Sequence, residues 1–254
     1  MIKKPAILLV ACLAALGTPN AQAKDWPAPI KALETQGVEV IGTFKAPGGL
    51  TGYAGVIEMQ PIAIYLTADG KQAIIGSMID AKGNDLSQKS LEKLVNKPMT
   101  DRAWKRLEQS TWIADGKNNA PRVIYTFTDP NCPYCNKFWN DARPWVTSGK
   151  VQLRHVMVAI LGPTSPGKAA AILAAKDTQA ALTQHEQQHA KGGAKALSQV
   201  PGKIRAQLDA NRELMQQLGA AATPTIFYKD ASGKLQKMQG APSGEMLTMI
   251  LGPR

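Results

Sequence analysis

The first third of the chain consists of short apolar runs separated by turn signals. An amphipathic run over residues 30–36 predicts a helix, and the runs after it are rich in β-branched and aromatic residues, which is typical of strands. We place these strands at residues 38–44, 52–59, 63–66 and 72–79. Asp69 and Gly70 form a hairpin signal between the last two. The pattern predicts a small antiparallel sheet in a domain at residues 24–84.

The spacing of apolar residues changes after residue 84. Leucines, Val95 and Trp104 recur at mostly helical intervals with charged residues between them, from residue 85 to residue 110. Pro98 interrupts this pattern because it lacks a backbone donor. We therefore predict a linker helix in two pieces, within a linker at residues 85–115 that leads to a second domain at residues 116–254.

The second domain opens with another strand-like run. Residues 122–128 are rich in β-branched and aromatic side chains and end at the turn signal Asp129-Pro130. A helix follows, and a further apolar run at residues 151–160 predicts a second strand. Two strands joined through a helix predict parallel pairing in a right-handed βαβ unit.

The rest of the second domain is mostly helical at first and then returns to strands. After the helical pattern of residues 165–218, Thr223-Pro224 leads into an apolar run. A proline at the start of a strand suits a cis peptide bond or an edge strand. An edge strand at residues 235–239 and a helix at residues 243–251 close the chain. This order is typical of a thioredoxin-like domain with a helical insertion. The predicted fold class is α+β for the first domain and α/β for the second.

Cys132 and Cys135 lie where the strand at residues 122–128 gives way to a helix. Asn131 or Cys132 can cap this helix, and Pro133 suits its first position. Unpaired N–H groups and the positive end of the helix dipole favour a thiolate there, so the pKa of such thiols falls from about 8.5 to roughly 3.5–7. Cys135 lies about one helical turn further on, close enough to attack a mixed disulfide. We predict Cys132 as the nucleophile and Cys135 as the resolving thiol.

Two other roles for this cysteine pair stay open. A structural zinc site needs four ligands, and the remaining soft ligands are His155, His185 and His189, at spacings far from those of zinc fingers. A structural disulfide across so small a loop would remove little chain entropy. Catalysis explains the pair better, because a chain of this length builds a core without a disulfide staple.

A second metal-binding pattern occurs in the helical stretch. The run from His185 through Glu186 to His189 matches the H-E-x-x-H pattern of zinc peptidases, and Glu213 can be suggested as a third ligand. The glutamines around it predict a solvated helix, whereas a zinc peptidase needs this helix in the floor of a cleft. We therefore predict no metal site, and we expect His155 to be a satisfied residue of the sheet.

The N-terminus has the pattern of a secretory signal at residues 1–23, with cleavage after Ala23. Cys12 ends a lipoprotein-like box, but the apolar run continues past it, so we expect no lipid anchor. Cleavage removes one of the three cysteines and two lysines, which lowers the formal net charge from +11 to +9. Outside the cytoplasm such a basic excess favours solubility and acidic partners, and we expect no nucleic-acid binding.

Several stretches resemble the family of DsbC and DsbG, which are periplasmic disulfide isomerases and reductases. They are residues 128–139, 142–146, 148–154, 165–177 and 214–228. DsbC-like members usually have glycine between the two cysteines, so Pro133 favours the DsbG branch. The resemblance implies a V-shaped homodimer, joined through cystatin-like N-terminal domains, in which linker helices lead to two thioredoxin-like catalytic domains.

The resemblance also implies roles for individual residues. It maps the nucleophile and the resolving thiol onto the two cysteines, and a substrate-binding cis-proline loop onto Thr223 and Pro224. It implies that Pro133 and Tyr134 tune the thiol pair and access to it. The H-E-x-x-H run belongs to no motif of this family.

The predicted function is that of a periplasmic thiol:disulfide oxidoreductase working from its reduced state. It would act as an isomerase of wrong disulfides, or as a reductase of sulfenylated cysteines, in client proteins. A DsbD-like membrane reductase is the implied electron donor, and no cofactor is needed. Two alternatives stay open, a periplasmic chaperone with secondary thiol activity and a net dithiol oxidase, because redox poise depends on the folded environment of Cys132.

Overall fold

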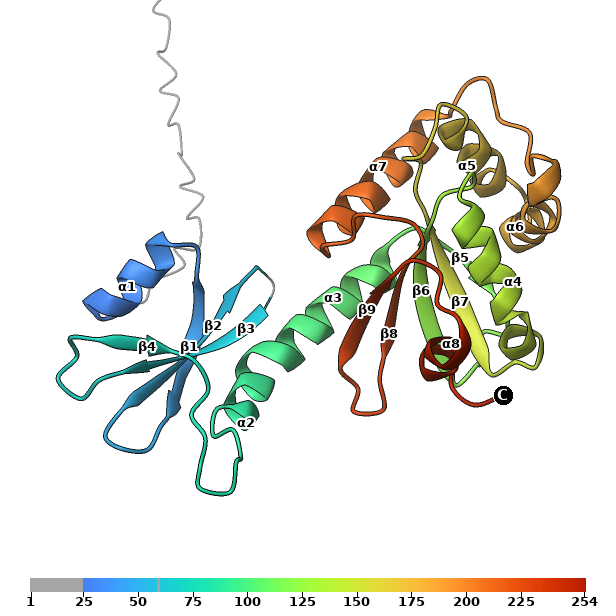
Figure 1. The fold of residues 1–254 in the computed structure, drawn as a ribbon. Coiled ribbons are helices and arrows are strands. Elements are labelled where there is room, and N and C mark those ends of the chain that lie inside the picture. The colour runs from blue at the N-terminus through green and yellow to red at the C-terminus, as the bar shows by residue number, and fades with distance from the viewer. Residues whose placement is uncertain (1–24, 59) are drawn as a thin grey trace, which may run out of the picture.

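The protein consists of two lobes joined by one long helical segment, as Figure 1 shows. This computed structural model describes residues 25–58 and 60–254. The N-terminal lobe contains a four-stranded sheet and the C-terminal lobe a five-stranded sheet, which confirms the predicted fold class. The predicted signal at residues 1–23, the cleavage after Ala23 and Cys12 lie outside the described residues.

The N-terminal lobe is an antiparallel sheet covered by one helix. Its elements are α1 (Ala28–Thr35), β1 (Glu39–Lys45), β2 (Thr51–Ile57), β3 (Gln60–Leu66) and β4 (Ala73–Ile75). The strands keep their chain order in the sheet. Ile30 of α1 is fully buried and packs with Tyr53 and Ile64 of the sheet. β4 is shorter than the predicted run to residue 79, because the chain leaves the sheet at Gly76, whose φ is +151°.

The linker helix is continuous, so the predicted break at Pro98 is wrong. It consists of α2 (Gln88–Leu91), the π-helical segment η1 (Glu92–Asn96) and α3 (Lys97–Gln109). The N–H of Lys97 bonds to the carbonyl of Glu92, five residues back, which gives this turn its wider π form. The wide turn lies directly before Pro98, which is in the first turn of α3. The helix therefore continues, although Pro98 has no backbone N–H to donate.

The sheet of the C-terminal lobe has the strand order β5-β7-β6-β8-β9. Its strands are β5 (Trp112–Asp115), β6 (Arg122–Thr128), β7 (Val151–Met157), β8 (Thr225–Lys229) and β9 (Leu235–Gln239). β6 and β7 run parallel through α4 (Pro133–Thr147), as the βαβ pattern predicts, and the other pairs are antiparallel. The sequence does not predict β5, because four residues are too few to display a strand period and β7 supplies the pairing edge.

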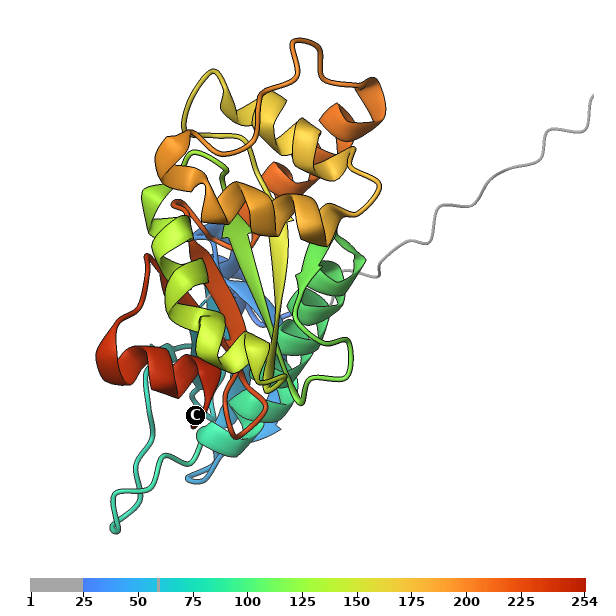
Figure 2. The ribbon, with the colours of Figure 1, turned by 90° about the vertical axis from the view of Figure 1, so that its right-hand side faces the viewer.

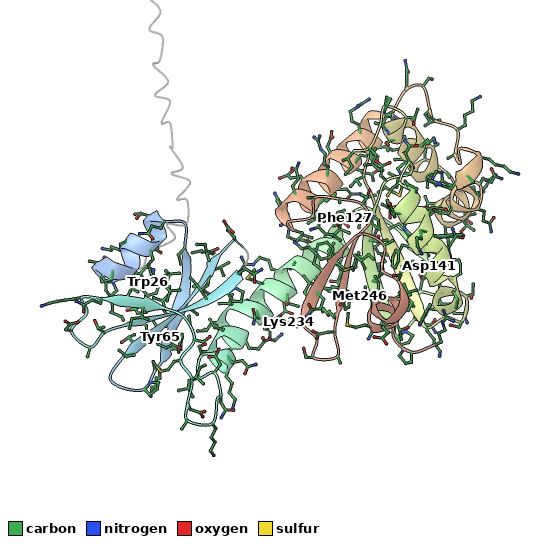
Figure 3. The ribbon with its side chains drawn as sticks, viewed as in Figure 1. Trp26, Tyr65, Phe127, Asp141, Lys234 and Met246 are labelled. Atoms are coloured by element: carbon green, nitrogen blue, oxygen red, sulfur yellow. The ribbon has the colours of Figure 1, made fainter. Side chains whose placement is uncertain are left out.

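Helices cover both faces of this sheet (Figure 2). The helices that follow the insertion are α7 (Gly202–Gln217) and α8 (Gly244–Leu251). On one face α4 and α8 pack over the sheet, where Ile124 meets Trp145. On the other face α3 and α7 pack over Phe127, labelled in Figure 3, and Leu107 of the linker helix joins this core. The second half of the linker helix is therefore part of the C-terminal lobe.

A helical insertion lies beside the start of α4. It contains α5 (Ser165–Leu173), α6 (Thr178–Gln187) and the short 3₁₀ helix η2 (His189–Lys191). The prediction of a solvated helix for the H-E-x-x-H run is wrong, since His185 and Glu186 are 2% and 3% exposed. They are buried because α6 packs Leu182 into the core formed with α5 and α7. Within residues 25–58 and 60–254, no helix is long and apolar enough to cross a lipid bilayer.

We expect Leu107→Ala to destabilise the C-terminal lobe, although Leu107 belongs to the linker helix. The side chain is fully buried, so its truncation leaves a cavity that should lower the free energy of unfolding by about 2–5 kcal/mol. Denaturant unfolding followed by tryptophan fluorescence measures this loss. Lys105→Ala, on the exposed side of the same helix, is the matched control. Equal free energies for the two variants would contradict the packing described here.

Candidate active site

The two cysteines lie at the junction of β6 and α4. Cys132 is the N-cap of α4 and Pro133 takes the first helical position, as the sequence predicts. The N–H of Cys132 donates to the carbonyl of Asp129 at 3.0 Å, which closes the turn between strand and helix. The sulfur of Cys132 is thereby held at the helix N-terminus, where unpaired N–H groups and the helix dipole favour negative charge.

The two thiols differ strongly in acidity. The backbone N–H of Cys135 donates to the sulfur of Cys132 at 3.3 Å, and both cysteines are free thiols. A hydrogen bond from the Cys135 thiol is the largest cause that lowers the pKa of Cys132, to about 6; burial opposes it, and the Thr223 hydroxyl and backbone N–H groups add to it. Burial, followed by the neighbouring Cys132 sulfur, raises the pKa of Cys135 well above its ordinary value. At neutral pH the pair is a thiolate beside a protonated thiol.

Exposure does not distinguish the two cysteines. Cys132 is 2% exposed and Cys135 is 3% exposed, so access to either sulfur is narrow. Pro133 and Tyr134 between them are exposed, and 63% of Tyr134 is open to solvent. The N–H of Tyr134 also favours the Cys132 thiolate. These two residues therefore border the solvent side of the thiol pair.

The loop before β8 brings Thr223 and Pro224 against Cys132, 91 residues away in the sequence. In its protonated form the Cys132 thiol donates to the Thr223 carbonyl, with the sulfur and the oxygen 3.2 Å apart. The Thr223 hydroxyl lowers the pKa of both cysteines, and it has no other partner within the described part of the chain. The Thr223–Pro224 peptide bond is cis, one of the two forms that the sequence indicates.

Asp129 holds the loop in front of Cys132, a role that the sequence analysis missed. The side chain is buried, and its carboxylate accepts hydrogen bonds from the N–H of Asn131 at 2.8 Å and the hydroxyl of Ser165 at 2.8 Å. It also accepts the N–H groups of Ile160 and Leu161 at 2.7 and 3.0 Å. An aspartate three residues before the N-cap of a helix is a recognisable Asx-turn signal, but the partners after β7 could not be read from the sequence.

A buried polar network lies beneath α4. Asp115 of β5 and Arg143 of α4 form an ion pair, and Nε2 of His155 lies 3.4 Å from the Asp115 carboxylate. Nδ1 of His155 lies 3.1 Å from the hydroxyl of Thr128 at the end of β6. Burial opposes ionisation of Asp115, but hydrogen bonds from His155 and Arg143 hold its pKa well below the ordinary value. His155 is a buried sheet residue whose Nδ1 lies within hydrogen-bond distance of Thr128, while its Nε2 lies near the Asp115 carboxylate without a well-aligned hydrogen bond.

The residues suggested for zinc do not form a metal site. Within the described ranges, no group of three or more histidine, cysteine, aspartate or glutamate side chains is placed to hold a metal ion. Nδ1 of His185 accepts the N–H of Ala194 at 2.9 Å, so that nitrogen is already occupied. Glu213 is exposed on α7, where its carboxylate accepts from the Gln217 amide at 2.7 Å.

Comparison with known proteins gives consistent matches in both lobes. Residues 111–252 match the family described as a thioredoxin-like domain, and residues 18–88 match the N-terminal domain of disulfide bond isomerase proteins. The chain is 52% identical to the thiol:disulfide interchange protein DsbG of Pseudomonas aeruginosa over 232 residues, 91% of each chain. It is 46% identical to DsbG of Escherichia coli K12 over 256 residues, 99% of each chain.

A solved structure adds evidence on the fold. The catalytic domain of ScsC from Proteus mirabilis superimposes with a TM-score of 0.51 at 20% identity, covering 61% of this chain and 96% of that domain. The full-length identities to the two DsbG proteins are far above this level. The chain therefore belongs to the DsbG family of thiol:disulfide interchange proteins.

Proposed function

We propose that this protein is a periplasmic thiol:disulfide oxidoreductase that acts from the reduced state on client proteins, with Cys132 as nucleophile and Cys135 as resolving thiol. The observation that carries the proposal is the geometry of the pair: Cys132 caps α4 and its sulfur accepts the Cys135 thiol and, at 3.3 Å, the Cys135 N–H, which favours a pKa of about 6 for Cys132, while burial raises the pKa of Cys135. A thiolate is the attacking form of cysteine, and a protonated neighbour stays unreactive until it is needed.

The reaction begins when the Cys132 thiolate attacks one sulfur of a client disulfide. A bond forms between Cys132 and that sulfur, the client S–S bond breaks, and the other client sulfur leaves as a thiolate. With a sulfenylated cysteine, the leaving group is hydroxide, which takes up a proton to become water. Either attack ends in a mixed disulfide between Cys132 and the client.

The mixed disulfide has two fates. In isomerisation, a client thiolate attacks the client sulfur of the mixed disulfide, so Cys132 leaves as a thiolate and no electrons are exchanged overall. In reduction, Cys135 loses its proton and attacks the Cys132 sulfur, which passes two electrons to the client and leaves the pair oxidised. A DsbD-like membrane reductase would then restore the two thiols, and no cofactor or metal takes part.

The cis-proline loop would hold the client beside the nucleophile. The carbonyl oxygen of Thr223 lies 3.2 Å from the Cys132 sulfur, so the backbone before Pro224 lies where an extended client segment must pass to reach the sulfur. Exposed Pro133 and Tyr134 would contact the same segment from the other side and tune access to the thiol pair. Export to the periplasm through a signal cleaved after Ala23 would supply the compartment where such clients occur.

A second copy of the chain would complete the protein as a homodimer. The edge strand β4 and the segment after it carry exposed isoleucines: Ile74, Ile75 and Ile79 are 54%, 52% and 62% exposed. An unpaired strand edge with exposed isoleucines favours pairing with another strand, and a two-fold axis lets the same edge serve both copies. Domain limits at residues 24–84, 85–115 and 116–254 would make the first domain the dimerisation unit.

The pKa of Cys132 predicts a specific pH dependence. The rate of iodoacetamide alkylation of the reduced protein should rise with a midpoint near pH 6 and vanish in Cys132→Ala. Because the folded-state pKa is depressed, the thiolate stabilises the reduced fold above the unfolded pKa of about 8.5, and this contribution is lost as the pH falls through about 6. A midpoint near 8.5 would contradict the assignment of Cys132 as nucleophile.

The redox state in cells tests the direction of electron flow. Acid quenching and thiol trapping of periplasmic extracts should find the Cys132–Cys135 pair mainly reduced, and oxidised in cells that lack the membrane reductase. A pair that is oxidised in both strains would identify a dithiol oxidase instead. Cys132→Ala should abolish thiol exchange while leaving any suppression of client aggregation intact. A Cys132→Ala variant that still supports client proteins in cells would favour the chaperone alternative.

Replacing an exposed isoleucine of β4 tests the dimer. Ile75→Asp places a charge in the proposed interface, and sedimentation should show a shift from dimer to monomer. Met249→Asp is the matched control, because Met249 is 55% exposed on α8 of the other lobe. A wild-type chain that sediments as a monomer would contradict the homodimer. An Ile75→Asp variant that still sediments as a dimer would contradict an interface at β4.

A further inference from the structure

Glu186 is a buried carboxylate that the proposed reaction leaves without a role. It lies near the end of α6 and is 3% exposed, although ionised carboxylates are rarely buried without a charged partner. Within the described ranges, no lysine or arginine forms an ion pair with Glu186. Its side-chain partner is the amide of Asn136, a residue next to the active-site cysteines.

Asn136 follows Cys135 directly and belongs to the first turn of α4. Its side-chain amide donates to the main-chain carbonyl of Glu186 at 2.7 Å and to the Glu186 carboxylate at 2.8 Å. The same residue donates its backbone N–H to the carbonyl of Cys132 at 3.2 Å. Two contacts from one residue of the insertion therefore hold the turn that contains both cysteines.

His185 contacts the other end of this segment. Its Nδ1 accepts the N–H of Ala194 at 2.9 Å, which fixes the ring inside the insertion. Burial lowers the pKa of His185, while the carbonyl of Pro130 partly opposes this shift. Nε2 of the ring has no well-aligned hydrogen bond within the described part of the chain. The pair His185 and Glu186 thus faces the chain just before Cys132 and just after Cys135.

The shape of this turn contributes to the acidity of the nucleophile, because it places both the thiol and the backbone N–H of Cys135 beside the Cys132 sulfur. The N–H of Cys135 reaches the Cys132 sulfur at 3.3 Å only while the first turn of α4 keeps its shape. A carboxylate bond is among the stronger hydrogen bonds in proteins, and here it holds the residue next to that donor. Loosening Asn136 would let the donor move away from the sulfur and so weaken the thiolate.

We infer that Glu186 is a positioning residue for the thiol pair: through Asn136 it fixes the first turn of α4 and keeps the Cys135 N–H on the Cys132 sulfur. The glutamate of the H-E-x-x-H run thus serves the thiol chemistry from outside the site, with no metal involved. This inference rests on the proposed role of Cys132 as nucleophile.

The test is alkylation of Cys132 as a function of pH in the full-length reduced protein. Glu186→Ala should raise the Cys132 pKa by about half a unit to one unit, because it removes one hydrogen bond that supports the turn. Glu186→Gln should stay near the wild-type value, since its amide oxygen still accepts from Asn136. Gln187→Ala, on the exposed side of the same helix, is the matched control and should not shift the pKa.

The sign of the shift separates positioning from a plain charge effect. A carboxylate near a thiolate raises the thiol pKa, so its removal alone would lower the pKa of Cys132 in both Glu186→Ala and Glu186→Gln. A lowered or unchanged pKa in Glu186→Ala would overturn the inference, even if the variant loses stability.

A second variant covers the case in which Glu186→Ala fails to fold. Asn136→Ala, at a half-buried site, should raise the Cys132 pKa by a similar amount. If both variants fold, their combination should shift the pKa no further than Asn136→Ala alone, because Asn136→Ala already removes both hydrogen bonds to Glu186. An unshifted Asn136→Ala would overturn the inference. A wild-type midpoint near 8.5 would instead overturn the proposed function itself, so the two failures are distinguishable.

Discussion

The chemistry of this protein depends on the contact of Cys135 with the sulfur of Cys132, to which both the thiol and the backbone N–H of Cys135 donate, the N–H at 3.3 Å. The contact exists because Cys132 caps α4 and Pro133 starts it, so the sulfur faces the unpaired donors of the first turn. The thiol of Cys135 is the largest cause that lowers the pKa of Cys132 and its N–H adds to this, while burial raises the pKa of Cys135. Two cysteines thus take different roles, attacking and resolving, because one lies at the end of a helix and the other lies three residues further along it.

Other parts of the C-terminal lobe hold this contact in place from several sides. The Asp129 carboxylate ties the preceding loop to the chain after β7, and Ser165 of α5 joins it. Beneath α4, the ion pair of Asp115 and Arg143 connects the edge strand to the helix. Each of these buried groups has its partners, which is what a polar network needs in order to rigidify a site. The thiol pair therefore lies in a preorganised frame.

The linker helix gives this frame a fixed attachment to the N-terminal lobe. Its first half packs Val95 against Ala54 and Val56 of β2, and its second half buries Leu107 in the core of the C-terminal lobe. Both ends are packed and the helix is continuous through η1, so one unbroken helical segment connects the two lobes. A second copy joined through β4 would carry its own thiol pair on an equivalent helix.

The sequence by itself determined the order of the elements, the capped helix with its two cysteines, and the Thr223–Pro224 loop, because these depend on local periodicity, turn chemistry and helix capping. It did not reveal β5, because a four-residue strand forms only by pairing with the edge of β7. It also predicted a break at Pro98, where the helix continues after a π-helical turn. It also placed the H-E-x-x-H run in solvent. Only the tertiary structure decided that Glu186 is buried against Asn136 and that Thr223 meets Cys132, because these contacts join residues 50 and 91 positions apart.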